Sequence, residues 1–421
     1  MTLQKSFVSS ARSAGILVLL CAAHTAQAQP PAASPRAEQP ASADGIRTLD
    51  VSDVFHLVLH PDSERLAPQN SRRFIVATPS IGSKPSTGFS AGFSSTTAFY
   101  SGEPGTTHIS SVSGGLKVSQ LGQKTSGVKL NIFTPDDRWV IQSDNRLQWT
   151  SANIYDLGGD ALATDALKLK YDYFRLNESA YRRVESGLFV GGGLNVSTHT
   201  NVEPGGSASA IPDQAAYAAY SAAHGFALGS QTSSGTSVGV LYDTRDNSIN
   251  ADHGVFANAV YRTYFSGFLG GDSTWQSMNL DMRTYLPLTH DARHKLAFWF
   301  LGNLVTGGTA PFLDLPETSF DGRSARGYGE GRYRGEHLLY GEVEYRGALT
   351  SNGLLGVVAF LNTTTVDNLA TGEKLFDSMA PGAGFGFRVL LNKRSRTNLC
   401  TDWGWGKDGS RGFYLAIQEA F

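Results

Sequence analysis

The sequence predicts an all-β fold, a transmembrane antiparallel β-barrel of about 16 strands with a short N-terminal helix, from three observations. Apolar and polar residues alternate along many segments, which is the pattern of strands with one apolar and one polar face. After residue 28, no apolar stretch is long enough to cross a bilayer as a helix. Aromatic residues make up 11% of the chain and charged residues only 17%, which fits a barrel with aromatic girdles.

The N-terminal segment, residues 1–28, is expected to be a signal peptide. A basic stretch with Lys5 and Arg12 precedes an apolar run over 14–23, and Ala26-Gln27-Ala28 fits a small-x-small cleavage site. The run is shorter than the roughly 20 residues that a spanning helix needs, which argues against a membrane anchor. Export and a barrel together predict a protein of the cell outer membrane of a Gram-negative bacterium, in contact with outer-membrane lipid.

Residues 29–72 are expected to form a linker that carries a short periplasmic helix over about 51–60. Asp50 and Asp53 form an N-terminal cap signature, apolar residues recur at helical spacing, and Pro61 ends the pattern. Two interpretations stay open for this helix. It either docks in or below the barrel mouth or serves only as an amphipathic tether.

The barrel is expected to span residues 73–421. Along 275–286, Met278 and Met282 fall on one face of the strand while Asp281 and Arg283 fall on the other, so one face suits lipid and the other water. The expected strands are approximately 73–81, 87–100, 108–119, 126–134, 138–150, 166–178, 181–198, 235–243, 254–265, 274–285, 292–304, 334–348, 353–363, 381–391, 396–404 and 412–421.

The connections predict the orientation of the barrel. Short periplasmic turns are expected at 135–137, 178–180, 350–352 and 392–395. The long segments 199–234 and 305–333 then lie outside the cell, and 244–253 faces the periplasm. Pro79 lacks a backbone N–H, so the pairing of the first strand with the last is expected to be the shortest in the barrel.

The last strand is expected to carry a C-terminal barrel signal. Its apolar residues share one face and end on a terminal aromatic residue, the arrangement that outer-membrane barrels present to their assembly machinery. The residues concerned are Phe413, Leu415, Ile417 and Phe421.

Four stretches in the same order resemble the BamA/TamA superfamily of outer-membrane assembly factors, also called the bacterial surface antigen family. Ser324-Ala325-Arg326-Gly327-Tyr328 resembles the family's V-R-G-Y signature in the sixth external loop. The others are Tyr242-Asp243-Thr244-Arg245-Asp246-Asn247, Gly341-Glu342-Val343-Glu344-Tyr345-Arg346, and Gly384-Phe385-Gly386-Phe387-Arg388 with Asp402-Trp403-Gly404-Trp405-Gly406. The resemblance covers roughly 73–421 and implies a barrel that assists insertion or translocation of proteins or lipids.

The chain departs from the family pattern at two places. The family recruits unfolded clients with repeated periplasmic domains, and residues 29–72 are too few to hold one. The family's thirteenth strand usually offers an aspartate to the loop arginine, whereas this chain has Asn362 at that position. The lock between loop and wall is therefore expected to be weaker or to depend on the glutamates of the twelfth strand.

The resemblance implies a loop-lock motif at Arg326, Gly327 and Tyr328. In the twelfth strand, Glu342 and Glu344 share a face by alternation and should point into the lumen as partners of Arg326, together with Asn362. A guanidinium suits bidentate pairing with a carboxylate. The alternative is that the arginines of this loop only solvate an external surface. These arginines are Arg323, Arg326, Arg332 and Arg334.

No enzymatic function is expected. The histidines show no metal-ligand spacing, and the pair His56 and His60 lacks the glutamate of a zinc protease motif, so neither a metal site nor a cofactor nor a catalytic group is assigned. The net charge of −2 gives no sign of a nucleic-acid partner. The alternative to an assembly role, with client proteins or lipids as partners, is a passive pore or structural surface barrel. The oligomeric state stays open.

Overall fold

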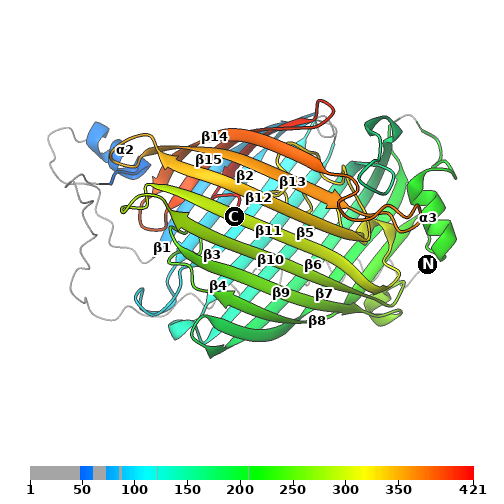
Figure 1. Ribbon diagram of the computed structural model, residues 1–421, viewed down its shortest axis with the longest axis horizontal. Coiled ribbons are helices and arrows are strands. Elements are labelled where there is room, and N and C mark those ends of the chain that lie inside the picture. The colour runs from blue at the N-terminus through cyan, green and yellow to red at the C-terminus, as the bar shows by residue number, and fades with distance from the viewer. Residues whose placement is uncertain (1–47, 60–72, 85–87, 121, 207) are drawn as a thin grey trace. The chain divides into compact units, whose positions relative to one another are not determined.

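The computed structural model describes residues 48–59, 73–84, 88–120, 122–206 and 208–421, which lie in one compact unit, Ser42–Phe421. The expected signal peptide and most of the linker lie outside these residues. One antiparallel sheet of 16 strands dominates the unit, and each strand pairs with its neighbour in the chain (Figure 1). The predicted antiparallel barrel fold is confirmed.

The strands are long, as expected for a barrel that crosses a bilayer at a tilt. Their bounds are β1 Arg73–Lys84, β2 Gly88–Phe99, β3 Ser110–Ser119, β4 Lys124–Phe133, β5 Trp139–Ile154, β6 Leu167–Glu185, β7 Leu188–Pro204, β8 Ser230–Asp243, β9 Gly254–Tyr264, β10 Trp275–Pro287, β11 His294–Gly308, β12 His337–Ala348, β13 Leu355–Val366, β14 Ala380–Asn392, β15 Thr397–Gly406 and β16 Arg411–Ile417.

Two α-helices are described, α2 (Val51–Leu59) and α3 (Ala216–His224), and they lie at opposite ends of the strands (Figure 1). Single 3-10 turns lie at Pro135–Asp137, Ala163–Asp165, Phe268–Gly270 and Phe312–Asp314. Within the described residues, no helix is long and apolar enough to span a membrane.

The turn predicted at 178–180 is wrong. Glu178, Ser179 and Ala180 lie within β6 and pair with both β5 and β7. The chain reverses instead at Gly187, whose positive φ of 72° suits a tight turn. The residues 178–180 therefore continue the strand and do not form a reversal.

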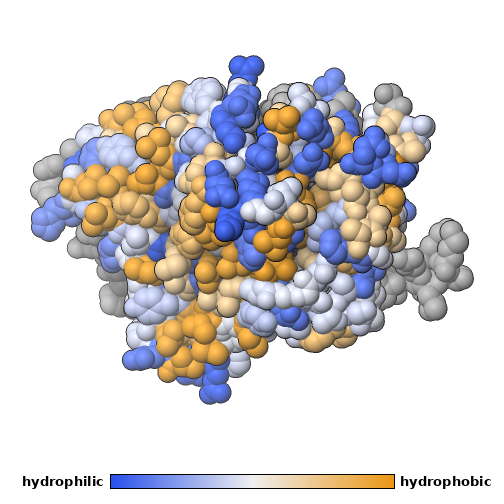
Figure 2. Space-filling model, turned by 45° about the vertical axis from the view of Figure 1, so that its right-hand side comes forward, coloured by the Kyte–Doolittle hydropathy of each residue, from blue (hydrophilic) through white to orange (hydrophobic). Residues whose placement is uncertain are grey.

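Alternation gives the sheet its two faces. In β10, Met282 is 49% exposed on the outer face, whereas Asp281 and Arg283 point inward and pair through bonds of 2.8 and 2.6 Å. Many large apolar side chains are exposed on the strands, and Figure 2 shows apolar patches among polar residues on one face of the molecule. Exposed apolar side chains on the strands fit a wall in contact with lipid. Asp281 and Arg283 share this face because the side-chain period of a strand is two.

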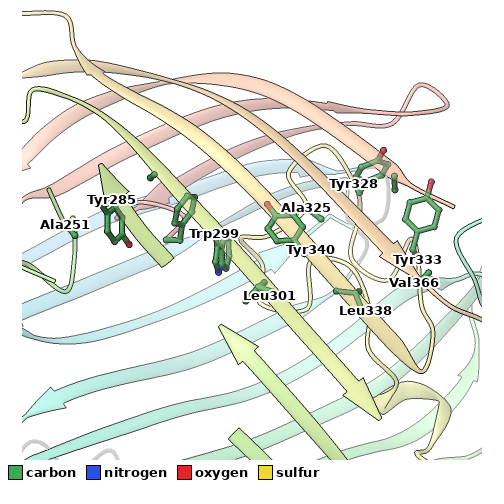
Figure 3. Close-up of a cluster of buried hydrophobic side chains, with 13 residues drawn as sticks. Ala251, Tyr285, Trp299, Leu301, Ala325, Tyr328, Tyr333, Leu338, Tyr340 and Val366 are labelled. Carbon is green, nitrogen blue, oxygen red and sulfur yellow. The ribbon is translucent and has the colours of Figure 1, made fainter. Parts of the chain in front are cut away.

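The buried core lies inside the barrel. Aromatic side chains from β10, β11 and β12 meet a loop and the C-terminal residue there, and Figure 3 shows Ala251 and Tyr285 at one end of this cluster and Tyr333 at the other. The lumen is thus packed with side chains along part of its length.

The two edge strands of the sheet meet without pairing. β1 and β16 approach each other, yet no ladder joins them among the described residues, whereas β1 pairs with β2 over its whole length, Pro79 included. The expected weak junction is therefore found, and it is weaker than predicted, because a short ladder was expected there.

Candidate functional site

The segment between β11 and β12, residues 309–336, folds into the barrel, and we call it the lumenal loop. Three groups of the wall form hydrogen bonds with this loop, two with its backbone and one with the hydroxyl of Tyr328. Arg146 of β5 donates to the Phe320 carbonyl at 2.8 Å, Tyr328 donates to the Pro381 carbonyl, and Gly327 N–H donates to the Tyr414 hydroxyl at 2.9 Å. Since these groups come from opposite parts of the sheet, the loop crosses the lumen.

Arg326 is the most constrained side chain of the lumenal loop. It is 2% exposed, and its guanidinium donates to Glu342, to Glu344 and, at 2.7 Å, to Asp402. The same guanidinium lies over the Phe360 ring, 3.7 Å from the centroid. The structure thus places the Arg326 guanidinium beside Glu342 and Glu344 on the inner side of the wall, and we call Arg326 with its three carboxylates the Arg326 cluster.

The glutamates reach Arg326 because even-numbered residues of β12 face the lumen. Tyr340 donates to Glu342 at 2.5 Å, and Arg346 donates to Glu344 at 2.6 Å. Each carboxylate therefore has a second partner besides Arg326. Buried ion pairs persist only when their remaining hydrogen-bonding capacity is satisfied, and these additional donors meet that condition.

Two residues, Asn362 and Asp402, bind Arg326 where the family pattern implies a single aspartate. The Asn362 amide donates to the Arg326 carbonyl at 3.1 Å and so holds the loop backbone and not the guanidinium. The third carboxylate comes from Asp402 on β15, which the sequence analysis quoted in a motif but did not assign as a partner. Asp402 is the only charged residue of β15 and lies on its inward face.

A glycine track on β14 and β15 accepts the loop backbone. Gly327 has a φ of 113°, and a Cβ there would lie 2.8 Å from the Trp405 carbonyl group. A Cβ on Gly404 would lie 2.7 Å from the Gly327 nitrogen, and one on Gly406 would lie 2.5 Å from the Tyr328 ring. The inward glycines thus allow an approach that any side chain would block.

The C-terminal residues turn into the lumen. Phe413 is exposed on the outer face of β16, but the chain bends at Gln418, whose φ is 75°. Glu419 then pairs with Arg388 at 2.7 Å, and Phe421 stacks on Trp299 with ring centroids 5.0 Å apart. The expectation that Phe421 continues one face of the last strand is therefore wrong, because the backbone leaves the strand four residues before the end.

The remaining arginines of the lumenal loop also have protein partners. Arg323 donates to the Glu419 carbonyl at 3.1 Å, Arg332 donates to the Ala161 carbonyl at 2.8 Å, and Arg334 pairs with Glu317. The alternative that these arginines only solvate an external loop is wrong. The segment 305–333 was expected to lie on the external side, with its loop folded so that Arg326 reaches the lumen, and its middle part does lie inside the barrel.

A second stretch that resembles the family, the 244–253 turn, is fixed to two other turns at the same end of the barrel. Arg245 pairs with Asp243 through bonds of 2.9 and 2.7 Å, and its carbonyl accepts a bond of 3.0 Å from His108. Arg396 bonds Asp246 at 2.5 Å. These contacts hold the 244–253 turn against two turns at the same end of the barrel, the one between β2 and β3 and the one between β14 and β15.

Both ring nitrogens of His108 face acceptors, because Nδ1 lies 2.6 Å from Asp137 and Nε2 faces the Arg245 carbonyl. Burial alone would lower the pKa of His108, but the hydrogen bond that His108 donates to Asp137 and the charges of Asp243 and Asp137 outweigh it and raise the pKa. A raised folded-state pKa means that protonated His108 stabilises the turn below the unfolded-state pKa. This contribution is lost as the pH rises through the folded-state pKa.

We expect amide-exchange protection of residues 244–253 to fall between about pH 6 and pH 8, after correction for intrinsic exchange. His108→Gln should remove this difference and leave the turn weakly protected at both pH values. His253→Gln, at an exposed position of the same turn, should keep it. Equal pH dependence in both variants would contradict the role given to His108.

A polar cavity of about 130 Å³ lies between the lumenal loop and the wall. Arg175, Arg262 and Tyr173 line it from the wall, and Asp314 lines it from the loop. Asp314 accepts bonds of 2.6 Å from two serines, Ser197 and Ser233, so this acid also ties the loop to the wall. The part of the chain that the structure describes holds no cluster of His, Cys, Asp and Glu suited to a metal ion.

Comparison with known proteins gives one family match. The model of the Omp85 superfamily domain matches residues 87–421. No curated protein sequence matches the chain.

Solved structures match at the level of the fold. BamA from Haemophilus ducreyi lacking POTRA domains 1–3 superposes with a TM-score of 0.51 at 13% identity, over 83% of this chain and 70% of that one. CdiB from Acinetobacter baumannii gives 0.51 at 11% identity, over 82% and 59%. CdiB from Escherichia coli gives 0.51 at 12% identity, over 84% and 64%. The chain spans less than two thirds of either CdiB, and the low identities support the fold alone.

Proposed function

Because this chain belongs to the Omp85 superfamily, we propose that it is an outer-membrane barrel that assists the insertion or translocation of proteins or lipids at that membrane. Barrels of this family are outer-membrane proteins of Gram-negative bacteria. The proposal gives this chain the same location, with the 244–253 turn toward the periplasm and α3 toward the outside.

The unpaired junction of β1 and β16 is the observation that carries the proposal. Backbone N–H and C=O groups at a sheet edge are a template for another strand. Inside a bilayer such groups find no water, so leaving them unpaired is costly, and an incoming strand would satisfy them. An edge of this kind suits the transient pairing that insertion of a β-rich client requires.

The filled lumen makes the alternative, a passive pore, the weaker proposal. The Arg326 cluster, the inward-turned C-terminal residues and the aromatic core occupy the same stretch of the barrel. The space beside the loop includes the polar cavity of about 130 Å³, which charged side chains of the wall and the loop line. A barrel filled in this way should conduct ions weakly.

A photocrosslinking experiment tests the proposal. The photoreactive residue p-benzoylphenylalanine replaces Phe413, outward on edge strand β16, or Val238, outward in the middle of the sheet on β8. We expect newly exported outer-membrane barrel proteins to crosslink at position 413 and not at 238. Depletion of the protein should also lower their abundance in outer-membrane proteomes.

A passive pore would give the opposite results in these experiments. No client crosslink at position 413, no change in the outer-membrane proteome and a large steady conductance in planar bilayers would support the passive pore and contradict an assembly role.

A further inference from the structure

Helix α2 and the end of the barrel wall enclose an apolar groove. Val51, Val54, Phe55 and Val58 line it from the helix, and Leu354 and Val389 line it from the wall, with a volume of about 300 Å³. These helix residues recur at the spacing of one helical face. No polar group lines the groove, so water inside it would lack hydrogen-bond partners.

The helix is held in place by its first turn. Asp53 N–H donates to the Asp50 carboxylate and Asp50 N–H donates to the Asp53 carboxylate, both at 3.0 Å, which is a reciprocal N-terminal cap. Lys393, in the turn between β14 and β15, donates from its backbone to Asp50 at 3.0 Å and from Nζ to Asp53 at 2.7 Å. Leu49 N–H bonds the Asn352 carbonyl at 3.0 Å. Two turns of the barrel rim therefore fix where α2 begins.

The wall side of the groove belongs to the outer face of the barrel. Val389 has the same parity on β14 as Phe385 and Phe387, and Phe387 is 46% exposed on the outside. The helix therefore packs against the outer surface of the rim. Of the two interpretations left open for this helix, docking in or below the mouth does not fit this position. The groove continues the surface that contacts lipid in a membrane barrel.

Much of the apolar face of α2 is not covered by the wall. Phe55 is 63% exposed and Val58 is 71% exposed. Exposed apolar side chains at the rim of a membrane barrel suit the boundary between headgroups and acyl chains. Arg394, exposed in the turn that binds the helix, supplies positive charge at the same rim.

We propose that α2 is an interfacial helix and that the groove binds an acyl chain of a periplasmic-leaflet phospholipid, whose phosphate pairs with Arg394. The proposal rests on the membrane location given under Proposed function. Three features select this occupant over a peptide or a second copy of the chain: a wholly apolar lining, continuity with the bilayer-facing wall and a basic residue at the headgroup side. The bound lipid would fasten two periplasmic turns to the membrane surface.

Spin labelling of the full chain in nanodiscs of phosphatidylethanolamine and phosphatidylglycerol tests the proposal. Nitroxides are attached at Phe55→Cys and Val58→Cys, with Ser52→Cys as the label on the polar side of α2. Leu361→Cys, on the outer face of β13, reports the bilayer itself. A high rate of collision between the nitroxide and oxygen indicates a label in lipid, and a high rate of collision with a water-soluble nickel chelate indicates a label in water. The labels at 55 and 58 should behave like the label at 361 and unlike the label at 52.

The outcomes separate this proposal from the proposed location. Water-like labels at 55 and 58 with a lipid-like label at 361 would overturn the acyl-chain site alone. Low collision rates with both reagents at 55 and 58 would show that protein covers the helix and would also overturn it. A water-like label at 361 would contradict the membrane location itself.

The headgroup contact has its own readout. Native mass spectrometry of the barrel should show about fivefold weaker retention of phosphatidylglycerol in Arg394→Gln, the fold-change that corresponds to the ~1 kcal/mol of one basic residue at a membrane surface. Arg411→Gln, exposed at the opposite end of the strands, is the matched control and should retain the lipid. Equal retention in both variants would overturn the assignment of Arg394.

Discussion

Replacement of Arg326 by alanine is expected to release the lumenal loop while the barrel still folds. The change leaves Glu342, Glu344 and Asp402 buried without their shared cation, and breaking a buried ion pair costs about 3–5 kcal/mol. The wall should persist because its strands are joined by backbone bonds that do not involve the loop. Externally added protease should then cleave within 309–336, and the conductance of the barrel in planar bilayers should rise.

Two further variants make this prediction specific. Arg326→Lys should rescue the loop only in part, because an ammonium cannot serve three carboxylates in the planar geometry of a guanidinium. Arg411→Ala, at an exposed position on the same side of the barrel, should behave as the wild type. Arg323 is unsuited as a control because it bonds the Glu419 carbonyl. Wild-type conductance and protease resistance in Arg326→Ala would mean that the cluster does not hold the loop.

Gly404→Ala is expected to have a similar effect without any change in charge. The added methyl group would lie 2.7 Å from the Gly327 nitrogen and 2.9 Å from the Arg326 carbonyl carbon, so the loop backbone must move. Overpacking of this kind costs about 1–3 kcal/mol, and here the displacement also pulls Arg326 away from Asp402. Protease sensitivity and conductance should rise, though less than in Arg326→Ala.

The matched control is Gly341→Ala. Gly341 lies on β12 next to Glu342, and a Cβ there meets no atom within 4 Å. This variant should keep the protease resistance and conductance of the wild type. If Gly404→Ala matched Gly341→Ala in both measurements, the close approach of Gly404 and Gly327 would not be what positions the loop.

The wall of the barrel could be predicted from the sequence because the face on which a strand side chain lies depends only on its position along the strand. A strand places every second side chain on the same face, so parity alone assigned Met282 to the lipid side and Glu342 and Glu344 to the lumen. The helix expected at about 51–60 spans Val51–Leu59, because its cap and its apolar spacing are also local signals.

The parts that were missed depend on contacts between distant residues. Asp402 meets Arg326 only through the lateral arrangement of β12–β15 and the path of a loop across the lumen, neither of which a single strand encodes. The bend at Gln418 carries no glycine or proline as a signal. Glycines alternate with larger residues along β14, but only Gly382 lies against the loop backbone, with its Cβ position 3.1 Å from the Arg326 carbonyl oxygen, so this alternation did not locate the loop in the sequence.

The inward bend at Gln418 ties the packing of the lumen to the completion of the sheet. Phe421 packs on Trp299 of β11, and Arg346 of β12 donates to the main-chain oxygen of Phe421 at 2.9 Å. These partners are far apart in the sequence, and contacts of this kind form late because the intervening chain must be ordered first. We therefore expect the interior of the barrel to reach its final packing only after β16 has joined the sheet, and an inserted affinity tag belongs in an exposed loop, such as the one around Gly206, and not next to Phe421.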